Sequence, residues 1–187
     1  DSPIKKLVIG GISIGILVYF IPPLYGEGFD VINSLISGDI EKALGNNSLN
    51  LDLSNIWIVI GLLAGLVFFK IIASALTFGA GGVGGIFAPT LFMGSIMGNC
   101  VAKLINNLGL TNYPVSESNF TLVGMAGLMA GVLHAPLTAI FLIAEVTSGY
   151  ELFIPLMLTA AISFSITKHF QPHSVYTMEL GRKGELI

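Results

Sequence analysis

Residues 79–89 read Gly-Ala-Gly-Gly-Val-Gly-Gly-Ile-Phe-Ala-Pro and lie between two apolar runs of membrane length. The glycines allow the backbone to bend tightly and leave it unshielded by side chains. Pro89 suits the first turn of a helix, where its missing N–H costs nothing. A helix that begins near Phe87 would leave the N–H groups of Ile86, Phe87 and Ala88 free, at the positive end of the helix dipole. The stretch therefore predicts an anion site inside a membrane, held by uncharged donors.

Two other interpretations of the same glycines remain open. Residues 79–84 match the dinucleotide-binding pattern G-x-G-x-x-G, which needs a preceding strand and an acidic residue about 20 positions later. Here an apolar run precedes the pattern and the next acidic residue is Glu117, so a nucleotide-binding membrane enzyme is disfavoured. Small residues in membrane helices also allow close helix packing, which needs no ligand.

The composition predicts an all-α, multi-pass membrane protein. Of the 187 residues 53% are hydrophobic and 10% are charged, and the mean hydropathy is +0.86. Between residues 53 and 116 the only charged side chains are Lys70 and Lys103, as expected of membrane spans. A net charge of −3 with no basic run disfavours nucleic acid as a partner. The single cysteine, Cys100, excludes a disulfide within the chain.

The apolar runs divide the chain, which is expected to form a single membrane domain over residues 1–187. Helical segments are predicted at residues 7–19, 31–36, 56–78, 87–105, 120–133, 136–148 and 152–166, with a polar loop at 37–54 and a membrane-proximal C-terminal segment at 168–187. Lys70 interrupts the longest run, and we expect its ammonium to snorkel toward an interface. Several runs are too short to cross a bilayer upright. Such broken helices are tolerated where they line a cavity, and transporters use them to build ion sites.

Five short motifs resemble the CLC family of chloride channels and chloride/proton exchangers, in the order and at the spacings of that family. They are Gly85-Ile86-Phe87-Ala88-Pro89, Gly124-Met125-Ala126-Gly127, Ala135-Pro136-Leu137-Thr138-Ala139, Glu145-Val146-Thr147 and Ser174-Val175-Tyr176. The similarity extends over most of the chain. Because one pentapeptide would be weak evidence and five ordered matches are strong evidence, we take the family as the working hypothesis.

The resemblance assigns roles to particular residues. The anion is expected on the backbone N–H groups of Ile86, Phe87 and Ala88 and on the hydroxyl of Tyr176, with Gly85 and Pro89 shaping the motif. A phenol donates one hydrogen bond without adding net charge, although a tyrosine after the last span could also be an interfacial anchor. The family's proton-handling glutamates lie in its first half, so we interpret Glu145 as structural.

The resemblance also implies what the whole protein does. This chain matches the second of two inverted halves of the family's membrane domain, and the first half, with the gating glutamate, is expected elsewhere. We expect chloride transport by a homodimer in the plasma or inner membrane, surrounded by lipid, with protons left open as a second partner. No enzyme activity, catalytic residue, cofactor or metal is expected. Channel or exchanger stays undecided, as does selectivity among chloride, bromide and nitrate, and the alternative is a secondary transporter for another anionic solute.

Overall fold

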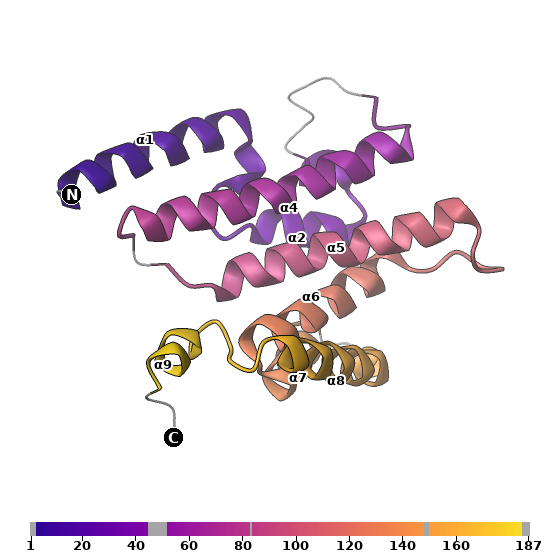
Figure 1. The fold of residues 1–187 in the computed structure, drawn as a ribbon. Helices are drawn as coiled ribbons and strands as arrows, with labels where there is room; N and C mark the ends of the chain where they lie inside the picture. The colour runs from indigo at the N-terminus through magenta and orange to yellow at the C-terminus, as the bar shows by residue number, and fades with distance from the viewer. Residues whose placement is uncertain (1–2, 45–51, 83, 148–149, 185–187) are drawn as a thin grey trace.

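The computed structural model describes residues 3–44, 52–82, 84–147 and 150–184, and every regular element in these ranges is helical (Figure 1). This confirms the all-α prediction. The helices are α1 (Pro3–Phe20), the 3-10 turn η1 (Pro22–Leu24), α2 (Phe29–Ser37), α3 (Ile40–Ala43), α4 (Ile56–Gly79), α5 (Phe87–Leu108), α6 (Glu117–Leu133), α7 (Pro136–Thr147), η2 (Tyr150–Leu152), α8 (Phe153–Phe170) and α9 (Met178–Lys183).

Three stretches in the described part of the chain are long and apolar enough to cross a membrane. They are α4 with 24 residues, α5 with 22, and the 21 residues from η2 through α8. Between them, α6 has 17 residues and α7 has 12, and His134, with a left-handed φ of 55°, separates the two. The chain is therefore a multi-pass membrane protein that contains broken helices, as predicted.

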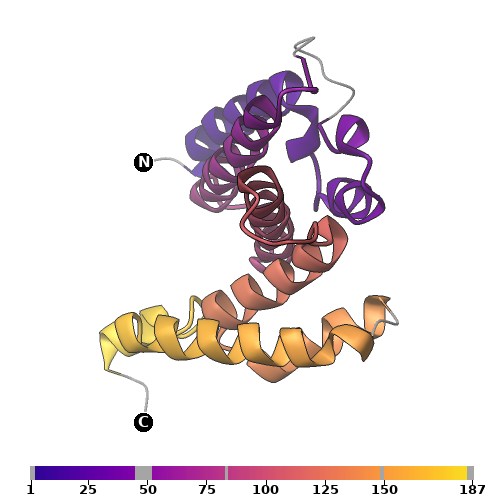
Figure 2. The same cartoon turned by 90° about the vertical axis from the view of Figure 1, so that its right-hand side faces the viewer.

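The helices form two groups joined mainly by the contact between α5 and α6, and α2 also packs against α6. In Figure 1, α1, α4 and α5 lie above, α7 and α8 lie below, and α6 descends between the groups; Figure 2 shows the same division from the side. Glycines allow this central contact, because a Cβ on Gly98 would overlap the carbonyl oxygen of Phe120 and one on Gly124 would overlap that of Gly94. Small residues thus serve close helix packing at this junction.

Two segments contain structure that their sequence did not predict. Within residues 37–54, expected as a polar loop, Asp39 caps α3 by accepting a hydrogen bond from the Lys42 N–H; residues 45–51 lie outside the described residues. In the C-terminal segment, the Val175 N–H donates to the Val132 carbonyl at 3.4 Å, and α9 follows. This bond ties the C-terminal segment to the end of α6.

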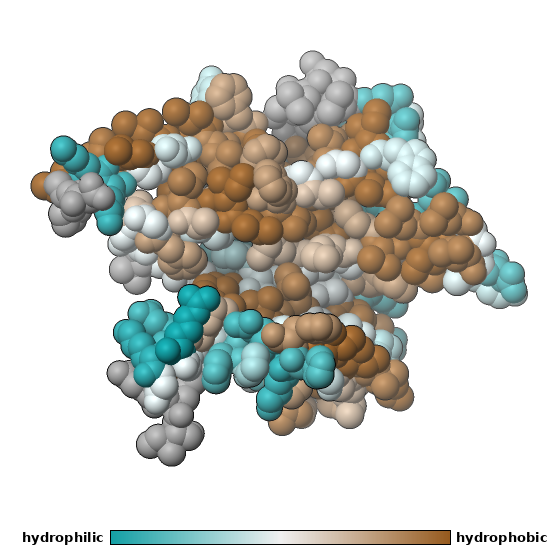
Figure 3. All heavy atoms as spheres, viewed as in Figure 1, coloured by the Kyte–Doolittle hydropathy of each residue, from teal (hydrophilic) through white to brown (hydrophobic). Residues whose placement is uncertain are grey.

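The surface matches a lipid environment. Large apolar side chains are exposed along α1, α4 and α8, among them Ile9, Phe68 and Ile154. Figure 3 shows hydrophobic residues spread over the upper helices, whereas hydrophilic residues gather around α9 at the lower left. Exposed apolar faces of this extent are expected where helices contact acyl chains.

Candidate anion-binding site

The first turn of α5 has backbone donors that find no acceptor among the described residues. α5 begins at Phe87, and Ile86 precedes it in a helical conformation with no side-chain cap. The Thr90 N–H and hydroxyl both donate to the Ile86 carbonyl, at 3.1 and 2.7 Å. Among the described residues, no backbone or side-chain group accepts from the N–H of Ile86, Phe87 or Ala88. Within the described residues these three N–H groups therefore stay available, and their role in holding an anion remains a prediction.

Close packing does not account for the first glycines of the preceding turn. A Cβ on Gly79 or Gly81 would meet nothing within 4 Å, and Gly81 has φ 86°. That conformation is readily adopted by glycine and rarely by other residues. The glycines therefore let the chain leave α4 and re-enter the molecule at α5, with the backbone uncovered. Val83 lies outside the described residues.

A cavity of about 590 Å³ adjoins this turn, and we call it the α5 cavity. Phe87, Ala88 and Pro89 line one wall, together with Gly84 and Gly85. The other walls come from the second half of α1, the turn 24–27 and the last turns of α4. Two of the three residues expected to donate N–H groups to the anion thus border an open space.

Lys70 is a second feature of the α5 cavity. Its side chain lines the cavity but is only 3% exposed. The Nζ donates to the carbonyl oxygens of Leu24 at 3.2 Å and Gly26 at 2.9 Å, and lies 4.7 Å from the centroid of the Phe92 ring. The expectation that Lys70 snorkels was therefore wrong, because these electronegative partners hold the ammonium inside the protein. The position of Lys70 within a long apolar run could have indicated that its side chain is buried, although not which groups it contacts.

Tyr176 does not lie at the α5 cavity in this structure. The residue is 58% exposed and is not among those lining the α5 cavity. Its neighbours are fixed by the Val175 bond to α6 and by a 3.1 Å hydrogen bond between the hydroxyls of Ser174 and Thr177. Helix α9, which follows, lies at the same end of the molecule as the first turn of α5 (Figure 1). The described residues do not bring the Tyr176 hydroxyl to the α5 amides.

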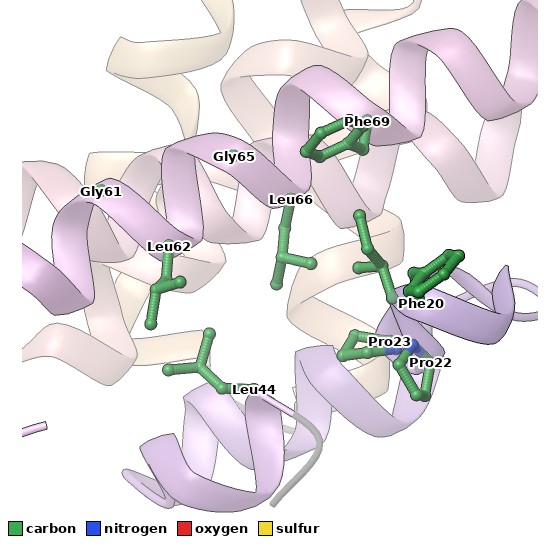
Figure 4. A pocket seen from close by; sticks show the side chains of 10 residues that line it. Phe20, Pro22, Pro23, Leu44, Gly61, Leu62, Gly65, Leu66 and Phe69 are labelled. Carbon is green, nitrogen blue, oxygen red and sulfur yellow. The ribbon is translucent and has the colours of Figure 1, made fainter. Parts of the chain in front are cut away.

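The remaining candidates add no anion ligand. A second cavity, of about 310 Å³ between α4, η1 and Leu44, is lined by apolar side chains, as Figure 4 shows for Leu62, Leu66 and Phe69. Glu145 is exposed and accepts a 2.9 Å hydrogen bond from the Tyr150 hydroxyl. Among the described residues no group of three His, Cys, Asp or Glu side chains is placed to hold a metal ion.

Comparisons with known proteins agree with the resemblance seen in the motifs. The family described as "Voltage gated chloride channel" matches residues 1–168. A ClcB-like protein of Ralstonia nicotianae is 33% identical over 183 residues, covering 96% of this chain and 38% of the relative. The H(+)/Cl(-) exchange transporter ClcA of Vibrio campbellii is 29% identical, covering 96% and 34%. The voltage-gated ClC-type chloride channel ClcB of Escherichia coli is 28% identical, covering 94% and 37%. The chain thus spans about a third of the length of these relatives.

Proposed function

Because the chain belongs to the voltage-gated chloride channel family, we propose that it forms part of a pathway that carries chloride across a membrane. The observation that supports this proposal is the α5 cavity, which is bordered by a helix start whose first N–H groups have no acceptor among the described residues. Amide donors at a helix N-terminus replace the water around an anion while carrying only part of a charge. Chloride can therefore bind and still leave, as conduction requires.

Tyr176 is proposed as a second ligand, supplied from the other group of helices. Its hydroxyl is exposed, and Tyr176 is not among the residues that line the α5 cavity. We infer that the two parts of the site meet only in the complete transport domain, whose other half would bring the gating glutamate. The same domain would form a homodimer, as the family resemblance implies.

The proposal is tested with the full-length protein reconstituted in liposomes loaded with potassium chloride. After dilution into potassium isethionate with valinomycin, the protein should release chloride, and protein-free liposomes should not. No release above that background would contradict the proposal. Uptake of organic anions by the same liposomes, with chloride itself not transported, would instead support a transporter for another anionic solute.

A second measurement separates the two modes of chloride transport. The names of the relatives include both a channel and an H(+)/Cl(-) exchange transporter, so either mode fits this family. Under a pH gradient with equal chloride on both sides, an exchanger gives a reversal potential that differs from zero. A passive chloride channel gives a potential of zero under the same conditions.

A further inference from the structure

We propose that Lys70 determines the charge selectivity of the α5 cavity. Its ammonium group offsets the partial negative charge of backbone carbonyl oxygens at the cavity wall, so that an anion can bind there. This inference rests on the proposed function, because it concerns the same cavity. It goes further in assigning a role to a side chain in α4, outside the motif that carries the resemblance. The argument begins with the carbonyl oxygens that Lys70 contacts.

The turn between η1 and α2 places carbonyl groups at the wall of the cavity. Leu24 and Gly26 both line it, and carbonyl oxygens carry partial negative charge that attracts cations and repels anions. The Lys70 Nζ donates hydrogen bonds to both carbonyl oxygens, at 3.2 Å to Leu24 and at 2.9 Å to Gly26. The lysine thereby occupies the groups on this wall that would oppose chloride.

The positive charge of the Lys70 ammonium is not neutralised by a carboxylate among the described residues. In the part of the chain that the structure describes, no carboxylate lies within 4.0 Å of the Lys70 Nζ. Two carbonyl dipoles and the face of Phe92 stabilise the ammonium without cancelling its full positive charge. Because the side chain is 3% exposed, water screens this charge weakly. The field therefore favours an anion in the cavity, next to the wall formed by the first turn of α5.

The lysine is also held in place by packing. Phe92 lies against Gly28, where a Cβ would overlap the aromatic ring, and Gly28 has φ 85°. The turn 24–28, α4 and α5 therefore meet around the Lys70 ammonium. A charge fixed in this way needs little reorganisation when an anion arrives, which is the condition for an effective electrostatic site.

The test compares variants of the full-length protein that separate charge from hydrogen bonding. Lys70→Gln keeps an N–H donor but loses the charge, and Lys70→Arg keeps the charge. Chloride affinity is measured by calorimetry, and selectivity for chloride over potassium is measured as the reversal potential across a bilayer that separates two potassium chloride concentrations. We expect Lys70→Gln to weaken chloride binding about tenfold or more and to shift the reversal potential from the wild-type value toward that of potassium. Lys70→Arg should stay close to the wild type.

A second variant keeps the proposal testable if Lys70→Gln does not fold. Glu27 is exposed and is among the residues that line the same cavity, and its side chain carries a carboxylate. Glu27→Gln should therefore strengthen chloride binding, the opposite direction. A folded Lys70→Gln with wild-type affinity and reversal potential would overturn the inference, as would a Glu27→Gln that binds chloride no more tightly. Failure of the proposed function has a different signature, namely a wild-type protein that releases no chloride.

Discussion

At the residue scale, Ile86 offers a direct test of an amide ligand. Its φ of −79° is within the range of proline, and among the described residues its N–H has no acceptor. Ile86→Pro would therefore remove one donor while α5 still starts at Phe87. We expect chloride affinity to fall about 10- to 100-fold, the equivalent of a lost hydrogen bond to an ion, measured by calorimetry on the full-length protein.

The matched control is Ile86→Val, which changes the side chain and keeps the N–H. It should bind chloride as the wild type does. A folded Ile86→Pro with unchanged affinity would show that this N–H does not contact the anion. Equal losses in both variants would assign the effect to side-chain packing.

Tyr176→Phe removes a hydroxyl and nothing else. If the complete protein brings this hydroxyl to the anion, chloride affinity should weaken about 3- to 30-fold, in keeping with one neutral donor. Tyr113→Phe is the control, because Tyr113 is 82% exposed in the connection between α5 and α6. Calorimetric titration of both variants decides the question, and indistinguishable affinities would assign Tyr176 to the membrane interface instead.

Single residues also show how far the candidate site could be predicted. The helix start at Phe87 could be predicted, since glycine and proline at fixed offsets define it, whereas the anion-binding role of the Ile86, Phe87 and Ala88 N–H groups stays a prediction. The environment of Lys70 could not be predicted, because its partners are carbonyl oxygens 46 and 44 positions away in the chain. Every residue carries such an oxygen, so the sequence gives no signal for this contact.

At the scale of the elements, the contact between α5 and α6 depends on glycine. Gly98→Ala would place a methyl group on the Phe120 carbonyl oxygen, and backbone atoms cannot move aside as side chains do. We expect a loss of unfolding free energy of about 1–3 kcal/mol, the usual cost of overpacking. Denaturant titration followed by circular dichroism in detergent measures it.

Gly61→Ala in α4 is the control for that substitution. A Cβ at this position would meet nothing within 4 Å, and alanine favours the helix by about 1 kcal/mol over glycine. The variant should therefore be as stable as the wild type or more stable. If Gly98→Ala also retained full stability, the helices would have to separate there at little cost, contrary to the packing described here.

The elements were more predictable than their ends. Long apolar runs gave α4, α5, α7 and α8 with their approximate bounds. Helix α6 begins at Glu117, three residues before the predicted start, because the Ser116 hydroxyl accepts the Asn119 N–H and extends the helix into a polar stretch. Helix α9 was missed because its six residues carry no apolar periodicity.

At the scale of the molecule, composition predicted a multi-pass helical membrane protein. It did not predict how the two groups of helices are arranged relative to each other. That arrangement depends on glycine contacts between α5 and α6, which no hydropathy pattern encodes. It has a functional consequence, since the α5 cavity belongs to the first group of helices and Tyr176 follows the second. Closing the site around an anion would require the remainder of a transport domain, and the relatives are long enough to contain one.

The last prediction follows from this incomplete site. The 187-residue chain, reconstituted alone, should insert in liposomes and show helical circular dichroism, yet release chloride no faster than protein-free liposomes. The full-length protein at the same protein-to-lipid ratio should release it. The physical reason is that an anion bound only by the α5 amides keeps part of its hydration shell. The ligands on its other side, which would replace that water, are missing. Chloride release by the 187 residues at the full-length rate would contradict this, since it would place a complete pathway within α1 to α9.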